Sequence, residues 1–156
     1  MRKAIVLHMQ QHKRFGEEDY EVLIISRDTN HINWNHEKAF IEAVEGAEAL
    51  INLAGKSVDC RYNEKNKSLI VNSRVETTRK LQSIIDKCKN PPKLWINSST
   101  ATIYRHSEDK AMDEDTDEIG LGFSVEVAKA WEKAFFEKPT DNTRKVALRI
   151  AWHCRI

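Results

Sequence analysis

Apolar residues gather in five short runs along the chain, and polar stretches separate them. Each run holds four to six residues that are apolar or nearly so between its two ends. Continuous runs of this length are typical of parallel strands that are covered on both faces. We therefore predict strands at Ala4–Leu7, Glu21–Ser26, Ala49–Leu53, Lys93–Asn97 and Lys145–Ile150.

Between these runs, apolar residues recur at helical spacing. Gly46 marks the end of the first helical segment, and Pro91 stops any helix before the fourth strand. Ser124 is the expected N-cap of the third segment. We predict helices over Glu37–Val44, Glu64–Cys88 and Ser124–Phe136. Because strands and helices alternate, the pattern indicates an α/β fold with a mainly parallel sheet.

Length and charge narrow the class of protein. A chain of 156 residues suits one domain over residues 1–156, large enough to bury a core. The net charge of +1 gives no electrostatic reason to expect nucleic acid or an acidic membrane as a partner. No apolar run approaches the roughly 20 residues of a membrane span, and no signal-peptide pattern opens the chain. Three widely separated cysteines favour a reducing compartment, and we expect the cytoplasm.

The segment ALINLAG, residues 49–55, ends a buried strand in small residues. Small residues at the carboxyl end of a parallel strand let a cofactor approach the backbone closely. The alternative is that Ala54 and Gly55 only turn the chain. The pattern alone supports both interpretations equally.

The segment KLWINSSTATIY, residues 93–104, ends another buried strand in hydroxyl groups. These belong to Ser98, Ser99, Thr100 and Thr102, with Tyr104 just beyond. Hydroxyls at this edge of an open α/β sheet lie where such sheets bind ligands, and they can hydrogen-bond a substrate oxygen. The alternative is a polar loop that caps a helix.

Together these motifs resemble the extended short-chain dehydrogenase/reductase superfamily, in its NAD(P)-dependent epimerase/dehydratase group. The chain is most similar to an atypical subgroup of sugar-nucleotide epimerase-like proteins. Its members share NLAGKSV, the pair Ser73-Arg74, PPKLWINSSTA and FSVEVAKAWEKAFF. The resemblance runs from about Glu21 to about Arg149. It implies a Rossmann-like, doubly wound parallel sheet that binds NADP or NAD and acts on a nucleotide sugar.

The resemblance also implies roles for individual residues. Thr100 matches the catalytic Ser/Thr that hydrogen-bonds the substrate. Ser98 and Ser99 match the strand end beside the nicotinamide. Arg27 matches a basic residue that contacts a ribose 2′-phosphate and favours NADP; the alternative is a solvated loop charge. The adenine and ribose side matches Asn52, Leu53, Ala54 and Gly55.

Three departures from the family pattern indicate impaired chemistry. First, the family's Tyr-x-x-x-Lys pair aligns with Ser124 and Ala128, and Lys129 lies about 100° further around the helix. Second, HMQQHKRFG replaces the glycine-rich phosphate loop after the first strand. Third, the chain ends at RIAWHCRI, where relatives continue into a substrate-binding lobe. We therefore expect an incomplete fold and weak dinucleotide binding.

A metal site is not expected. His8 and His12 lie one helical turn apart, and His31 and His36 are near neighbours, but no third ligand lies nearby. The acidic stretch at residues 107–120 lacks the glycine and glutamate placement of a calcium loop.

Three hypotheses follow from these observations. The chain is an NAD(P)-dependent epimerase-like protein with impaired or lost catalysis, a non-catalytic binding or regulatory module on the same scaffold, or a truncated product. Its expected partners are a dinucleotide and a nucleotide-sugar substrate. Self-association into a homo-oligomer is left open.

Overall fold

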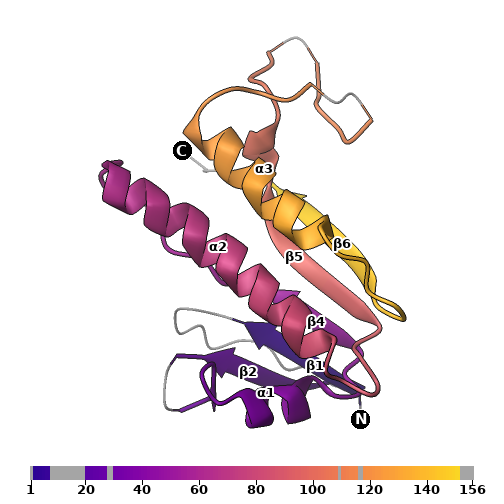
Figure 1. Ribbon diagram of the computed structural model, residues 1–156. Helices are drawn as coiled ribbons and strands as arrows, with labels where there is room; N and C mark the ends of the chain where they lie inside the picture. Colours follow the sequence, from indigo (N-terminus) through magenta and orange to yellow (C-terminus); the bar gives the residue numbers. More distant parts are fainter. Residues whose placement is uncertain (1, 8–19, 28–29, 109, 116–117, 152–156) are drawn as a thin grey trace.

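The computed structural model describes residues 2–7, 20–27, 30–108, 110–115 and 118–151. Six parallel strands form one sheet in the order β3-β2-β1-β4-β5-β6 (Figure 1). The strands are β1 (Arg2–Leu7), β2 (Tyr20–Ser26), β3 (Ile32–Asn33), β4 (Ala49–Asn52), β5 (Leu94–Thr100) and β6 (Arg144–Ile150). This order is that of a Rossmann-like α/β fold.

The strand order reverses between β1 and β4, which lie side by side in the middle of the sheet. From β1 the chain steps outward through β2 to β3, and then it crosses back to β4 and continues outward to β6. In open α/β sheets, ligands bind beyond the carboxyl ends of the strands at such a reversal. Leu7 and Asn52 end the two strands that flank this point, in matching register.

Three helices cover one face of the sheet. They are α1 (Glu37–Val44), α2 (Glu64–Ile85) and α3 (Phe123–Phe136), and a short 3-10 helix, η1 (Ala101–Ile103), follows β5. α2 and α3 run alongside one another (Figure 1). A single hydrophobic core contains side chains from all three helices and from β1, β2, β4 and β5. Its largest side chain is Trp95. The rings of Trp95 and Phe135 pack edge to face, with their centroids 4.8 Å apart.

The main elements confirm the sequence predictions. All five predicted strands are present, and α1 has the predicted bounds. The two-residue β3 was missed. β5 continues three residues beyond Asn97, because its pairing with β6 extends to Thr100 and Ile150, so the predicted site hydroxyls lie within the strand.

Two expectations about the ends and faces of elements were wrong. Ser124 is not the N-cap of α3: the cap is Gly122, whose φ of 106° favours glycine, and Ser124 is the second helical residue. The expectation that each strand is covered on both faces was wrong for β6, the last strand of the sheet. Its residues Leu148 and Ile150 are 44% and 48% exposed.

Several expectations fall on residues that the structure does not describe. The segment proposed to replace the phosphate loop, with His8 and His12, lies outside the described residues, and so does the end of the chain from residue 152. Within the described ranges, no helix is both long enough and apolar enough to cross a bilayer.

Candidate functional site

A small recess lies at the point where the strand order reverses. It has a volume of about 20 Å³ and is lined by Leu7, Ile25, Ser26, Arg27, Trp34, Ala54 and Thr77. The first four come from the carboxyl ends of β1 and β2, Ala54 follows β4, and Thr77 comes from α2. The recess therefore brings together Arg27 and Ala54, two of the residues predicted to contact a dinucleotide.

The charge around this recess is positive. Arg27 is exposed, and among the described residues nothing forms a hydrogen bond or ion pair with its guanidinium. Lys80 lies over the ring of Trp34 at 4.6 Å, and its ammonium donates a hydrogen bond to the Trp34 carbonyl at 2.7 Å. Burial lowers the pKa of Lys80, the Glu37 carboxylate opposes this, and the charge of Arg27 lowers it further. The positive charge of Arg27 thus acts against the charged form of Lys80.

Asn52 shapes the turn after β4 from a fully buried position. Its side-chain amide donates to Oδ1 of Asn97 on β5 at 2.6 Å, and its Oδ1 accepts from the backbone N–H of Ala54 at 3.1 Å. The N–H of Leu53 donates to the carbonyl of Leu7 at 3.1 Å, which ties the ends of β1 and β4 together. The Asn52 side chain is therefore engaged within the protein and places Ala54 at the recess.

The next turn is held by Ser73 and Arg74 of α2. The Ser73 hydroxyl accepts from the N–H of Lys56 at 2.9 Å, and Nη1 of Arg74 donates to the Lys56 carbonyl at 3.1 Å. A Cβ atom on Gly55 would lie 3.0 Å from Cζ of Arg74, closer than Cβ contacts normally come. Gly55 therefore has a packing reason to lack a side chain, whether or not a cofactor lies against it.

The predicted catalytic residue, Thr100, ends β5. Its Oγ1 accepts from the N–H of Thr102 at 3.2 Å and lies 3.0 Å from the Thr102 hydroxyl, so Thr100 caps η1. Capping was the alternative interpretation of this segment, and it describes the observed contacts of Thr100. Ser98 and Thr100 alternate with Ser99, so their side chains point to the opposite face of the sheet.

Ser99 belongs to a hydrogen-bonded network on the helical face. Its hydroxyl donates to Oε1 of Glu132 on α3 at 2.5 Å. Arg149 on β6 donates to both oxygens of Glu132, at 3.1 and 2.8 Å, and to the hydroxyl of Tyr104 at 2.7 Å. We call these four residues the β5–β6 network. It joins two strands, α3 and the residue that follows η1.

The β5–β6 network pairs its charges internally. Burial raises the pKa of Glu132, but the hydrogen bonds from Arg149 and Ser99 outweigh burial and hold that pKa below its ordinary value. The hydrogen bond to Glu132 raises the pKa of Arg149. Both groups remain charged near neutral pH, and each neutralises the other.

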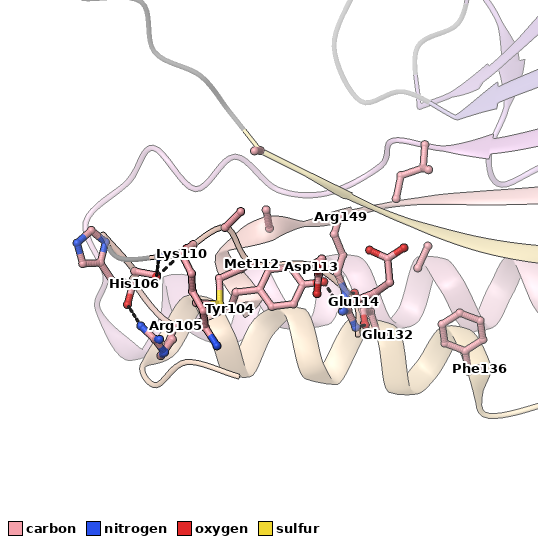
Figure 2. A pocket seen from close by; sticks show the side chains of 16 residues that line it. Tyr104, Arg105, His106, Lys110, Met112, Asp113, Glu114, Glu132, Phe136 and Arg149 are labelled. Atoms are coloured by element: carbon pink, nitrogen blue, oxygen red, sulfur yellow. Dashed lines mark hydrogen bonds and ion pairs between the residues drawn. The ribbon is translucent and has the colours of Figure 1, made fainter. Parts of the chain in front are cut away.

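A larger cavity of about 990 Å³ opens beside this network, between α3, β6 and the segment after η1. Figure 2 shows Tyr104, Glu132 and Arg149 close together on one side of it, with Arg105, His106 and Lys110 further along. None of the residues predicted to bind a dinucleotide or substrate lines this cavity. It meets the predicted site only through Glu132, which lines the cavity and accepts the hydrogen bond from Ser99.

Comparison with known proteins identifies the family. The NAD dependent epimerase/dehydratase family matches residues 10–122, more than half of the chain. The chain belongs to this family. The resemblance drawn from NLAGKSV and SSTATIY is thereby confirmed.

Two curated members of the epimerase family are close enough in sequence to compare in detail. The epimerase family protein YfhF of Bacillus subtilis is 35% identical over 123 residues, which cover 73% of this chain and 41% of YfhF. The epimerase family protein SDR39U1 of Homo sapiens is 31% identical over 135 residues, which cover 83% of this chain and 45% of SDR39U1. The chain thus spans less than half the length of these relatives.

Solved structures agree with this assignment. The crystal structure of human SDR39U1 (isoform 2) with NADPH matches with a TM-score of 0.74 at 26% identity, over 94% of this chain and 52% of that chain. The nucleoside-diphosphate sugar epimerase from Corynebacterium glutamicum matches with a TM-score of 0.66 at 20% identity, over 95% of this chain and 33% of that chain. At that identity the second likeness shows the fold alone.

One departure from the expected family chemistry can be located on α3. At the two positions aligned with the Tyr-x-x-x-Lys pair, Ser124 is exposed and Ala128 is fully buried. Lys129 points to solvent and pairs with Glu126 at 3.2 Å. The prediction that Lys129 faces away from the Ala128 position is confirmed, so this part of α3 does not present a tyrosine and lysine side by side.

Sequence reasoning missed several residues of these two regions. Trp34 and Thr77, which line the recess, and Lys80, which contacts Trp34, were not singled out. Thr77 and Lys80 are three residues apart on one helix and so share a face. Arg149 was missed as well. The alternation of side chains along a strand places Arg149 on the face that the helices cover. A charged residue on a covered face needs a partner, and this could have identified Arg149 from the sequence.

Proposed function

We propose that this chain binds the adenosine half of NADP(H) at the recess between β1, β2 and β4. Arg27 would contact the 2′-phosphate, and Leu53, Ala54 and Gly55 would lie along the adenine and ribose. Asn52 would hold that turn in place from beneath. Ser98 and Ser99 would flank the nicotinamide end, and NAD is the alternative cofactor.

The observation that carries the proposal is the guanidinium of Arg27, which lies at a recess on the strand reversal and has no partner among the described residues. An exposed cation at the end of the second strand favours a 2′-phosphate over a free hydroxyl. The residues described here therefore fit the adenosine end of the cofactor. The human SDR39U1 structure, which contains NADPH, covers this region of the fold and supports the same cofactor class.

We further propose that epimerase chemistry on a nucleotide sugar is impaired or lost. Bound NADP(H) would supply hydride transfer. Thr100 would hydrogen-bond a substrate oxygen, but neither Ser124 nor Ala128 can act as an acid of lowered pKa beside a lysine. A binding or regulatory module is therefore the second candidate, and the missing tyrosine and lysine are what favour it. The three separated cysteines support a cytoplasmic placement.

Titration with NADPH and NADH, followed by nicotinamide fluorescence, tests the proposal. We expect NADPH to bind more weakly than micromolar, and Arg27→Gln to weaken NADPH binding about tenfold while NADH changes less than about twofold. Arg61→Gln changes an exposed arginine that does not line the recess, and it is the matched control. Equal losses for both dinucleotides would contradict the role of Arg27, and micromolar or tighter binding would contradict the weak affinity.

A search for turnover separates the two candidates. Incubation with UDP-sugars and NADP⁺, monitored by proton NMR, should give no epimerised product. If product forms, the non-catalytic module is excluded, and Thr100→Ala should then abolish the reaction.

A further inference from the structure

Lys80 lies next to the same recess, against Trp34, although it is not one of the residues that line it. It lies one turn after Thr77 on α2, and Thr77 lines the recess. Its ammonium is fixed over the ring of Trp34, another lining residue, by the hydrogen bond to the Trp34 carbonyl. The side chain is therefore held against a residue that lines the recess and does not extend freely into solvent.

The donors of Lys80 are only partly used. A lysine ammonium has three N–H donors, and within the described residues one of them has a hydrogen-bond acceptor, the Trp34 carbonyl. The carboxylate of Glu37 favours the charged form of Lys80, but it is already bonded to Lys87 at 2.6 Å. Lys80 thus retains donors for an anionic ligand.

Arg27 lines the recess, and the Lys80 ammonium lies over the ring of Trp34, which lines it too. Like charges held near each other are unfavourable unless an anion lies between them. A phosphate monoester carries up to two negative charges and three acceptor oxygens near neutral pH. It could therefore accept hydrogen bonds from both side chains and remove their repulsion.

We propose that Lys80 is a second ligand of the 2′-phosphate and, with Arg27, sets the preference for NADP over NAD. This inference rests on the proposed function. If it is right, the preference for NADP depends on Lys80 of α2 as well as on Arg27 at the end of β2. The contact of Lys80 with Trp34 would then serve to aim the ammonium at the phosphate.

The test uses adenosine 2′,5′-bisphosphate and AMP, which differ only in the 2′-phosphate. Their dissociation constants are measured by calorimetry for the wild type, Lys80→Gln and Lys80→Arg. We expect Lys80→Gln to weaken bisphosphate binding about fivefold to tenfold and AMP binding less than about twofold. Lys80→Arg should restore most of the loss, because the charge is kept.

Controls separate this inference from a purely structural role. Lys65→Gln makes the same change on the same helix, about 22 Å away along its axis, and should leave both constants unchanged. If Lys80→Gln weakens both ligands equally, Lys80 only clamps Trp34 and the inference is overturned. Should the Gln variant fail to fold, Lys80→Met, which keeps the aliphatic contact with Trp34, takes its place under the same criteria.

The failure of this inference is distinct from the failure of the proposed function. If Arg27→Gln lowers the preference for the bisphosphate and Lys80→Gln does not, Lys80 is excluded and the adenosine site stands. If the wild-type chain shows no preference for the bisphosphate over AMP, both the proposed function and the role of Lys80 are overturned.

Discussion

The recess at β1, β2 and β4 and the β5–β6 network lie at the same edge of the sheet. They differ in whether their charged side chains are paired within the protein. At the recess, Arg27 has no partner among the described residues, and Lys80, which is held against the lining residue Trp34, has spare donors within the same described ranges. In the β5–β6 network, Glu132 and Arg149 pair through two hydrogen bonds. One region leaves positive charge unneutralised, and the other neutralises its charges within the protein.

This difference indicates where a ligand contributes free energy. An anion gains little from a guanidinium that already binds a carboxylate, and it gains more from one that has no partner. The recess is therefore the better candidate for ligand binding. The β5–β6 network instead holds the end of β5, with Thr100, against α3 and β6.

The largest expected effect comes from opening the β5–β6 network. Glu132→Ala removes the acceptor of both Ser99 and Arg149 and leaves a partly buried guanidinium without a counter-charge. We expect the free energy of unfolding to fall by about 3 kcal/mol. Urea denaturation followed by tryptophan fluorescence measures it.

The matched control lies on the same helix. Glu126 is exposed and pairs only with Lys129, so Glu126→Ala should cost less than about 0.5 kcal/mol. If the two variants lose the same stability, the network is not a structural unit. Under conditions where Glu132→Ala remains folded, its affinity for adenosine 2′,5′-bisphosphate should match that of the wild type.

A smaller effect is expected at the turn between the two regions. Gly55→Ala places a methyl group against the Arg74 guanidinium, which must shift by a few tenths of an ångström and so strains its hydrogen bond to the Lys56 carbonyl. We expect a cost of about 1–2 kcal/mol in the same denaturation experiment. In the Arg74→Ala background, where the space is free, the cost of Gly55→Ala should fall below about 0.5 kcal/mol. Additive costs in the double variant would exclude this contact as the cause.

The smallest effect is a change in acid sensitivity. The pKa of Glu132 is lower in the folded chain than its ordinary value of about 4.3. The charged carboxylate therefore stabilises the fold above that ordinary pKa, and this stabilisation is lost as the pH falls through the lowered one. The stability difference between wild type and Glu132→Gln should be larger at about pH 6 than at about pH 3.5. A constant difference would show that the charge of Glu132 does not matter.

The parts of the fold that follow local patterns could be predicted from the sequence. Apolar runs located five strands, and helical periodicity gave α1 its observed bounds. β3 has only two residues and carries no such pattern. The start of α3 depends on the left-handed backbone of Gly122, whereas Ser124 only resembles a cap in composition.

The site was less predictable, because its contacts join distant segments. Lys80 meets Trp34 across 46 positions, and Tyr104 meets Arg149 across 45. Motif reasoning did place Arg27 and Ala54 where they share one recess. Motif reasoning could not show that Asn52 and Ser99 direct their polar atoms into the protein. In a continuous apolar run, the sequence does not reveal to which face of the sheet a given side chain points.

The central claim is that the adenosine end of NADP(H) binds at the recess and not beside the β5–β6 network. Two-dimensional NMR of the labelled chain, titrated with adenosine 2′,5′-bisphosphate, tests it directly. We expect amide shifts to concentrate at Ser26, Arg27, Trp34, Ala54 and Thr77, and the amides of Tyr104, Glu132 and Arg149 to remain unchanged. Shifts confined to the β5–β6 network, or absent from the recess at saturating ligand, would contradict it.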